Sequence, residues 1–251
     1  MKGLQVLMRK LERDTSTALS LLIVVSVVVA AAAAGLSSPD TRFGDLMRGA
    51  RALLIVGGGA AALSTLVGFV AGVSAAWWGR RAEGAQTRLL EIVGTYPGIA
   101  MVAFVQGLNR SGSVLPLIAA LTIVRVAEVT RVVRIEILRT RSSDFVLAAV
   151  SLGASPWRVA IRHIGPQMVG ALAHSALCGF AMLVTLEAAM SFLGIGATSP
   201  NGSWGTAIAV QLRSPHPQGA LVPALALFAV LWAFLRLSEA VARRPRAARL
   251  G

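Results

Sequence analysis

The sequence predicts an all-α, polytopic membrane protein with about six transmembrane helices. Hydrophobic residues make up 55% of its 251 residues and charged residues only 14%, whereas a soluble domain carries about 25% charge. The apolar residues gather in runs long enough to cross a bilayer, which takes about 20 helical residues. Lipid offers the backbone no hydrogen-bond partners, so such runs are expected to be helices.

We predict spans at residues 15–35, 52–78, 89–106, 114–133, 167–190 and 219–235. Together they form one transmembrane domain, 15–240, between an N-terminal tail at 1–14 and a C-terminal tail at 241–251. A Tyr96-Pro97 pair lies inside the third span, where the proline removes a backbone donor and predicts a kink. A loop rich in Gly, Pro and Ser separates the last two spans.

The basic residues predict the orientation of these spans. With six spans both termini lie on the same side of the membrane, and most of the 24 Lys and Arg residues fall on that side. Cytoplasmic loops carry this excess of positive charge, so we expect both termini in the cytoplasm. The same topology accounts for the net charge of +13 without a nucleic-acid partner.

Residues 141–166, which we call the corner segment, lie between the fourth and fifth spans and predict two short helices with a sharp turn between them. Ser143 is placed to cap the first helix through its hydroxyl, and Asp144 lies at the positive end of the helix dipole. Gly153 stands where that helix needs a residue that tolerates positive φ in order to end.

The second helix of the corner segment is expected to begin after Ser155, its predicted cap, with Pro156 in the first turn. It must end before Pro166. Each helix has an apolar stripe at helical spacing: Phe145, Ala148, Ala149 and Leu152 in the first, and Trp157, Ala160, Ile161 and Ile164 in the second. The stripes fit either a knob offered to a partner in the aqueous phase or a helix pair lying on the membrane surface.

The sequence lacks the patterns of the common enzymatic sites. It has no G-x-x-x-x-G-K-[ST] loop for nucleotide phosphates, no H-E-x-x-H pair and no G-x-S-x-G elbow. Its three histidines are scattered, and its single cysteine, Cys178, excludes a disulfide framework. We therefore expect no catalytic residue, no metal site and no cofactor in this chain.

Two motifs resemble those of bacterial ABC importer permeases. The corner segment is similar to their EAA loop, E-A-A-x-x-x-G followed by I-x-L-P, except that Leu147 stands in place of the glutamate. Residues 186–196, L-E-A-A-M-S-F-L-G-I-G, and the later Ser203-Trp204-Gly205 resemble a signature of the second permease in dipeptide, oligopeptide and nickel importers. In this chain the second motif comprises Ser191, Phe192, Leu193, Gly194, Gly196, Trp204 and Gly205.

The resemblance implies a permease subunit of an ATP-driven importer in the bacterial inner membrane, for peptides, nickel or other small solutes. It implies a second permease subunit, two ATPase subunits that hold ATP and magnesium, and an extracytoplasmic solute-binding protein. The residues implied in coupling to the ATPase are Asp144, Phe145, Ala148, Ala149, Leu152, Gly153, Ala154, Ser155, Trp157, Arg158, Ile161, Arg162, His163 and Pro166. The rival interpretation is a self-contained secondary transporter or channel, but an internal inverted repeat typical of such transporters is not evident.

Ionisable residues inside predicted spans are functional candidates because charge is costly in lipid. We assign Arg125, Glu128, Glu187 and Tyr96 to a possible translocation path. Arg125 and Glu128, three residues apart, either line that path or only pair with each other. For Glu187 a gate or loop anchor is as good an interpretation as a ligand contact, and His174 is expected to make a helix-packing hydrogen bond.

Overall fold

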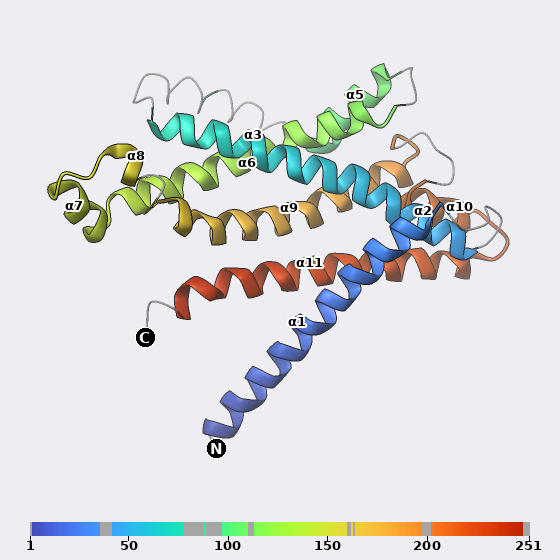
Figure 1. The fold of residues 1–251 in the computed structure, drawn as a ribbon. Helices are drawn as coiled ribbons and strands as arrows, with labels where there is room; N and C mark the ends of the chain where they lie inside the picture. Colours follow the sequence, from blue (N-terminus) through green and yellow to red (C-terminus); the bar gives the residue numbers. More distant parts are fainter. Residues whose placement is uncertain are drawn as a thin grey trace.

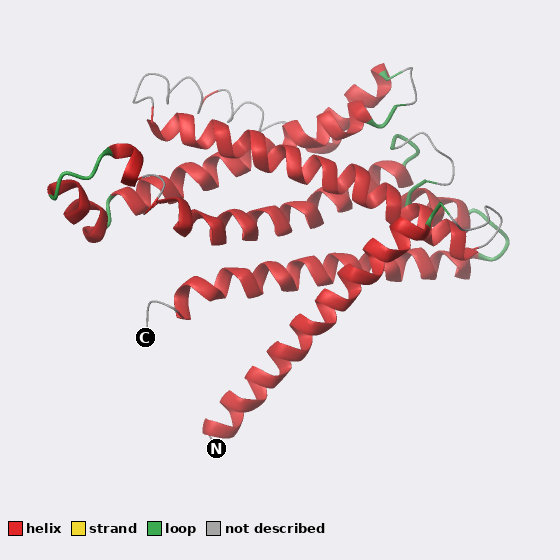
Figure 2. Ribbon diagram, viewed as in Figure 1, coloured by secondary structure: helices red, strands yellow, loops and turns green. Residues whose placement is uncertain are grey.

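In the part of the chain that it describes, the computed structural model consists of helices joined by turns and loops (Figure 2). It describes residues 2–35, 42–77, 88, 97–109, 113–159, 162, 164–196 and 202–247, and their side chains except those of 2–14, 42, 77, 156, 157 and 244–247. No strand occurs in these ranges. The all-α prediction is confirmed.

The first half of the chain contributes α1, which runs obliquely to the other helices, and further helices that lie along an elongated bundle (Figure 1). Their bounds are α1 Lys2–Ala33, α2 Arg42–Leu53, the π-helical turn η1 Leu54–Gly58, α3 Gly59–Trp77, α5 Gly98–Leu108 and α6 Leu115–Arg141. The helix that contains the second predicted span begins at Arg42, earlier than the sequence pattern suggests, because α2, η1 and α3 follow one another without a break.

The second half begins with the two short helices of the corner segment and continues with two long helices. The bounds are α7 Asp144–Ser151, α8 Pro156–Val159, α9 Gly165–Phe192, α10 Trp204–Leu212, the 3-10 turn η3 Pro217–Ala220 and α11 Leu221–Ala247. The segment predicted as a loop between the last two spans therefore contains a helix, α10. This helix was not predicted because Gly and Pro are common in the segment and are typical of loops.

Four described stretches are long and apolar enough to cross a membrane: Thr15–Ala33, Phe43–Ala76, Gly165–Phe192 and Pro217–Arg243. They overlap the first, second, fifth and sixth predicted spans. The fourth predicted span lies in α6, which has 27 residues but carries several charges. Of the third, the described part lies from Pro97 onward, mostly in α5.

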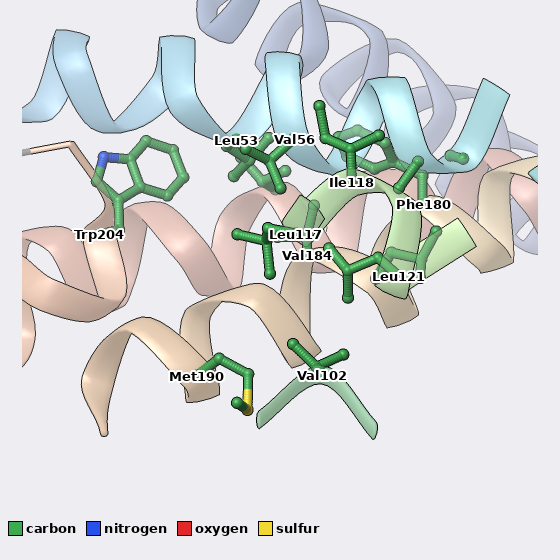
Figure 3. Packing of buried hydrophobic residues seen from close by; sticks show 14 of the residues in the cluster. Leu53, Val56, Val102, Leu117, Ile118, Leu121, Phe180, Val184, Met190 and Trp204 are labelled. Atoms are coloured by element: carbon green, nitrogen blue, oxygen red, sulfur yellow. The ribbon is translucent and has the colours of Figure 1, made fainter. Parts of the chain in front are cut away.

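The core lies where α3, α6 and α9 cross (Figure 3). Leu117 and Leu121 of α6 are fully buried there beside Val56 of η1 and Val184 of α9. Helices in lipid gain little from the hydrophobic effect and associate by close packing, which small residues allow. Accordingly, α3 presents glycines to α6: a Cβ at Gly68 or Gly72 would come within 2.6 Å of Val129 or Val133, respectively.

The two ends of the bundle differ in structure. Figure 1 shows α7 and α8 at one end and α2 and α10 at the other, which we call the distal end. The last turn of α11 lies toward the end with α7 and α8, whereas α1 runs obliquely and its first residues lie apart from the bundle.

Candidate functional site

The corner between α7 and α8 is built by one glycine. Gly153 has φ +84°, a left-handed conformation that side chains disfavour. The N–H of Ala154 donates to the carbonyl of Ala149 at 3.0 Å, and the N–H of Gly153 donates to that of Val150 at 2.9 Å. This pair of bonds is a Schellman motif, so the chain leaves α7 at a fixed angle.

The caps of the two helices differ from one another. The Ser155 hydroxyl accepts from the N–H of Arg158 at 3.4 Å, as expected for the cap of α8. Ser143 occupies the N-cap position of α7, but its hydroxyl donates to the carbonyl of Thr140 at 2.6 Å and does not cap the helix. The prediction for Ser143 was wrong because the last carbonyls of α6 also lack partners.

The second short helix ends before Pro166, as predicted. The described α8 covers Pro156–Val159, and Pro166 lies in the first turn of the next helix, α9. A proline fits there because the first turn of a helix needs no donor from its backbone.

The face of α7 that packs on the bundle is not the predicted stripe. Val146 is buried in a cluster that includes Val133 and Ile137 of α6 and Met168 of α9. The stripe itself points outward: Phe145, Ala148 and Leu152 are exposed, and Leu152 has 89% of its surface exposed. The corner segment thus has one anchored face and one exposed apolar face.

The charged side chains of the corner segment that were implied in coupling are exposed as well: Asp144, Arg158 and Arg162. Of the uncharged residues implied in coupling, Pro166 is also exposed, while Ala149 and Ala154 are half-buried. Tyr96, Ile161, His163 and the side chain of Trp157 lie outside the described residues.

A second candidate site lies between α6 and α9, around Arg125. Its side chain is 2% exposed and forms an ion pair with Glu128, whose side chain is 52% exposed. One guanidinium nitrogen also donates to the carbonyl and the hydroxyl of Ser175 in α9, at 2.7 and 3.2 Å. The Arg125–Glu128 pairing expected from spacing is present, whereas Ser175 could not be inferred because it is 50 residues away in the chain.

His174 joins α9 to α11, as expected for a helix-packing hydrogen bond. Its Nδ1 lies 2.9 Å from the carbonyl of Ser238. A carbonyl only accepts, so Nδ1 carries the proton and Nε2 is left facing the Cys178 thiol at 4.0 Å. Among the described residues, no group of three or more His, Cys, Asp or Glu side chains is placed to hold a metal ion.

At the distal end the second motif surrounds a buried carboxylate. Glu187 accepts hydrogen bonds from Ser191 and Ser203, and Trp204 and Gly205 open the neighbouring helix α10. Gly194 has φ +79° and ends α9 in a second Schellman motif, which also buries Gly196. Phe192 and Leu193 are exposed.

Comparison with known proteins identifies the family. The family model described as "Binding-protein-dependent transport system inner membrane component" matches residues 64–247. A putative peptide transport system permease protein of Brucella suis biovar 1 is 34% identical over 167 residues, 65% of this chain and 55% of that protein. The dipeptide transport system permease protein DppC of Lactococcus lactis subsp. cremoris is 27% identical over 203 residues, 79% of this chain and 59% of that protein.

Two further matches agree with these. The oligopeptide transport system permease protein OppC of Bacillus subtilis is 30% identical over 158 residues, 63% of this chain and 52% of that protein. A chain of the MetNI methionine ABC transporter, solved in inward-facing conformations, has a TM-score of 0.65 at 18% identity and covers 79% of this chain and 95% of that chain. This match shows that the two chains share a similar fold.

The extent of these matches decides what they establish. This chain spans only 52% to 59% of the length of the three relatives named above. The family model, however, covers most of the chain, including the Arg125 site, the corner segment and the second motif at the distal end. The chain therefore belongs to the family of inner membrane components of binding-protein-dependent transport systems.

Proposed function

We propose that the chain is a permease subunit of an ATP-driven ABC importer and that its solute is a peptide. The relatives named above carry peptide, dipeptide and oligopeptide transport in their names, which supports peptides over nickel or another small solute. The observation that carries the mechanism is the fixed corner of α7 and α8, which lies at one end of the bundle and has an exposed apolar face.

The corner segment would transmit movements of an ATPase subunit, as a rigid unit, to the transmembrane helices. Val146 fixes α7 to the cluster that α6 and α9 share, so a push on α7 reaches both helices. The exposed Phe145, Leu147 and Leu152 supply apolar contact area for the partner. Arg158 and Arg162 add positive charges that pair best with an acidic surface.

The remaining subunits of the proposed importer are separate chains. In the proposal two ATPase subunits bind ATP and magnesium, a second permease completes the path, and an extracytoplasmic solute-binding protein delivers the solute. This chain hydrolyses nothing and holds no cofactor. Both termini and the corner segment face the cytoplasm, an orientation supported by the excess of basic residues in these segments.

The decisive experiment tests this coupling. In the assembled complex, Gly153→Arg leaves the protein in the membrane but forces a side chain onto the left-handed corner. We expect ATP hydrolysis stimulated by the binding protein to be lost. Ser142→Arg is the control, because it adds the same charge at an exposed residue that has negative φ and lies before α7. Normal stimulation in Gly153→Arg would contradict the coupling role.

The polar path is a separate part of the proposal and includes Arg125, Glu128, Glu187 and Tyr96. Its support is strongest at Glu128, a half-exposed carboxylate near the middle of α6. Exposing a carboxylate to lipid is energetically costly, so the exposed side of Glu128 fits a water-filled path. Glu128→Ala should lower import while stimulated ATP hydrolysis persists. Glu136→Ala, near the end of the same helix, should leave import unchanged.

A further inference from the structure

The distal end contains a buried carboxylate that belongs to two helices at once. Glu187 lies in α9 and is 3% exposed. Its Oε1 accepts from the Ser191 hydroxyl at 2.7 Å, one turn further along α9. Its Oε2 accepts from the Ser203 hydroxyl at 3.2 Å, directly before α10. One oxygen is thus held by its own helix, and the other reaches across to the next one.

The contact to Ser203 continues into the backbone of α10. The Ser203 hydroxyl caps this helix by accepting from the N–H of Gly205 at 3.2 Å, while it donates to Glu187. A hydroxyl can do both at once. The Glu187 carboxylate is thus connected, through the Ser203 hydroxyl, to the first turn of α10.

The packing around this chain of hydrogen bonds admits only small residues. A Cβ at Gly205 would overlap the carbonyl group of Ala188, and one at Gly196 would overlap Ser191. Helix α10 therefore lies against the backbone of α9 itself, with the carboxylate at the edge of this contact.

Two more hydrogen bonds extend the contact to the neighbouring helices. The indole of Trp204 donates to the carbonyl of Leu46 in α2 at 3.0 Å. The amide of Gln106 in α5 donates to the carbonyl of Gly196 at 3.1 Å. The ends of α2, α5, α9 and α10 thus meet at one polar cluster, at the far end from α7 and α8 (Figure 1).

A polar attachment of this kind differs from apolar packing in one physical respect. Hydrogen bonds to a carboxylate are stronger than those between neutral groups, and a partly broken buried network is costly. At the end of a bundle, however, water can replace all of the bonds together when the helix moves away. Such a contact favours two states, attached or released, over intermediate ones.

We propose that Glu187 is a positioning residue that fastens α10 over the distal end of the bundle and keeps water from the inner face of that helix. The attachment makes α10 a closure of this end, which opens when the two serine contacts to Glu187 are exchanged for water. This inference concerns the closure alone and does not depend on which solute is carried.

The test measures how often the inner face of α10 becomes exposed. Ala209, buried in α10, is replaced by cysteine in a Cys178→Ala background, and the full chain is placed in lipid nanodiscs. The rate at which a charged maleimide labels Cys at this position reports the population in which α10 is released. We expect Glu187→Ala to raise that rate by at least about tenfold, since it removes the acceptor of both hydrogen bonds and leaves two buried hydroxyls without it.

Three comparisons make the result specific. Ser203→Ala should also raise the rate, whereas Ser214→Ala, whose hydroxyl contacts only Gln211 among the described residues, should not. Glu187→Gln keeps one acceptor oxygen and should fall between the unsubstituted chain and Glu187→Ala. A cysteine at buried Ala127 in α6 should stay unlabelled in every variant.

The outcomes separate closure from general stability. Faster labelling of position 209 alone, in the expected order of variants, supports the proposal. Unchanged labelling in Glu187→Ala would overturn it, and so would equal labelling of positions 209 and 127, because the residue would then stabilise the whole bundle instead of positioning α10.

Discussion

Arg125 of α6 occupies the space in which a side chain at Gly179 of α9 would lie. The guanidinium reaches this place because α9 has no Cβ there, and it then meets Ser175 one turn away on the same helix. A buried cation needs full hydrogen bonding to be tolerated, so glycine and arginine depend on each other across the α6–α9 contact.

The first prediction follows from this dependence. Gly179→Ala places a methyl group in overlap with the guanidinium and should destabilise the protein by about 1–3 kcal/mol, as overpacking does. The measurement is the thermal unfolding midpoint of the full chain in detergent or nanodiscs. Gly58→Ala is the matched control, because the nearest atom to its Cβ would be Phe180 Cε2 at an ordinary 3.9 Å. Equal midpoints for the two variants would contradict this account.

The sequence predicts the elements well and their partners poorly. Gly153 was identified from its place after an apolar helix, and its φ of +84° agrees, because the requirement for positive φ is local. The dependence of Arg125 on Gly179 is not local, since no spacing relates residues on two helices. For the same reason Val146, one apolar residue among many in α7, was missed as the buried anchor of the corner segment.

The second prediction concerns the close contact of α3 with α6. A Cβ at Gly72 would lie 2.6 Å from Val133 and 2.9 Å from the backbone carbonyl oxygen of Thr130, which cannot move without its helix. Gly72→Ala should therefore separate the two helices and lower the unfolding midpoint by several degrees, an effect of about 1–3 kcal/mol. Gly59→Ala in the same helix meets Ile118 only at 3.6 Å and should have little effect.

The third prediction isolates backbone strain in the corner. Around Gly153 nothing lies within 4 Å of a Cβ, so Gly153→Ala adds no steric overlap with neighbours. It still costs about 1–2 kcal/mol, because an L-residue disfavours the left-handed conformation. Gly107→Ala, which also meets nothing within 4 Å, is the control without positive φ.

We expect the cost at Gly153 to appear in coupling more than in stability. In the assembled complex Gly153→Ala should reduce import and stimulated ATP hydrolysis together, while the unfolding midpoint of the permease falls by only a few degrees, because α7 and α8 lie outside the main core. A fall in the midpoint without any change in coupling would show that the corner serves stability only.

The second motif at the distal end shows what a sequence resemblance could and could not supply. Glu187, Ser191, Ser203, Trp204 and Gly205 were singled out together, but the role of Glu187 was left open between a gate or loop anchor and a ligand contact. The structure adds the two hydroxyls on the carboxylate and the burial of the group. Neither follows from spacing, because Ser203 belongs to a loop whose path the sequence does not specify.

The fourth prediction tests whether Arg125 acts through its shape as well as its charge. A guanidinium binds Glu128 and Ser175 through different nitrogens at once, whereas an ammonium is a single point of charge. Arg125→Lys should therefore keep one of the two contacts and lose the other, at a cost of about 1–3 kcal/mol for the polar group left unpaired. Arg139→Lys is the control on the same helix, because Arg139 is largely exposed and its ion pair with Glu136, 4.0 Å long, needs only a charge. If both lysine variants unfold at the same midpoint as the unsubstituted protein, the contacts of the Arg125 guanidinium do not hold α6 against α9.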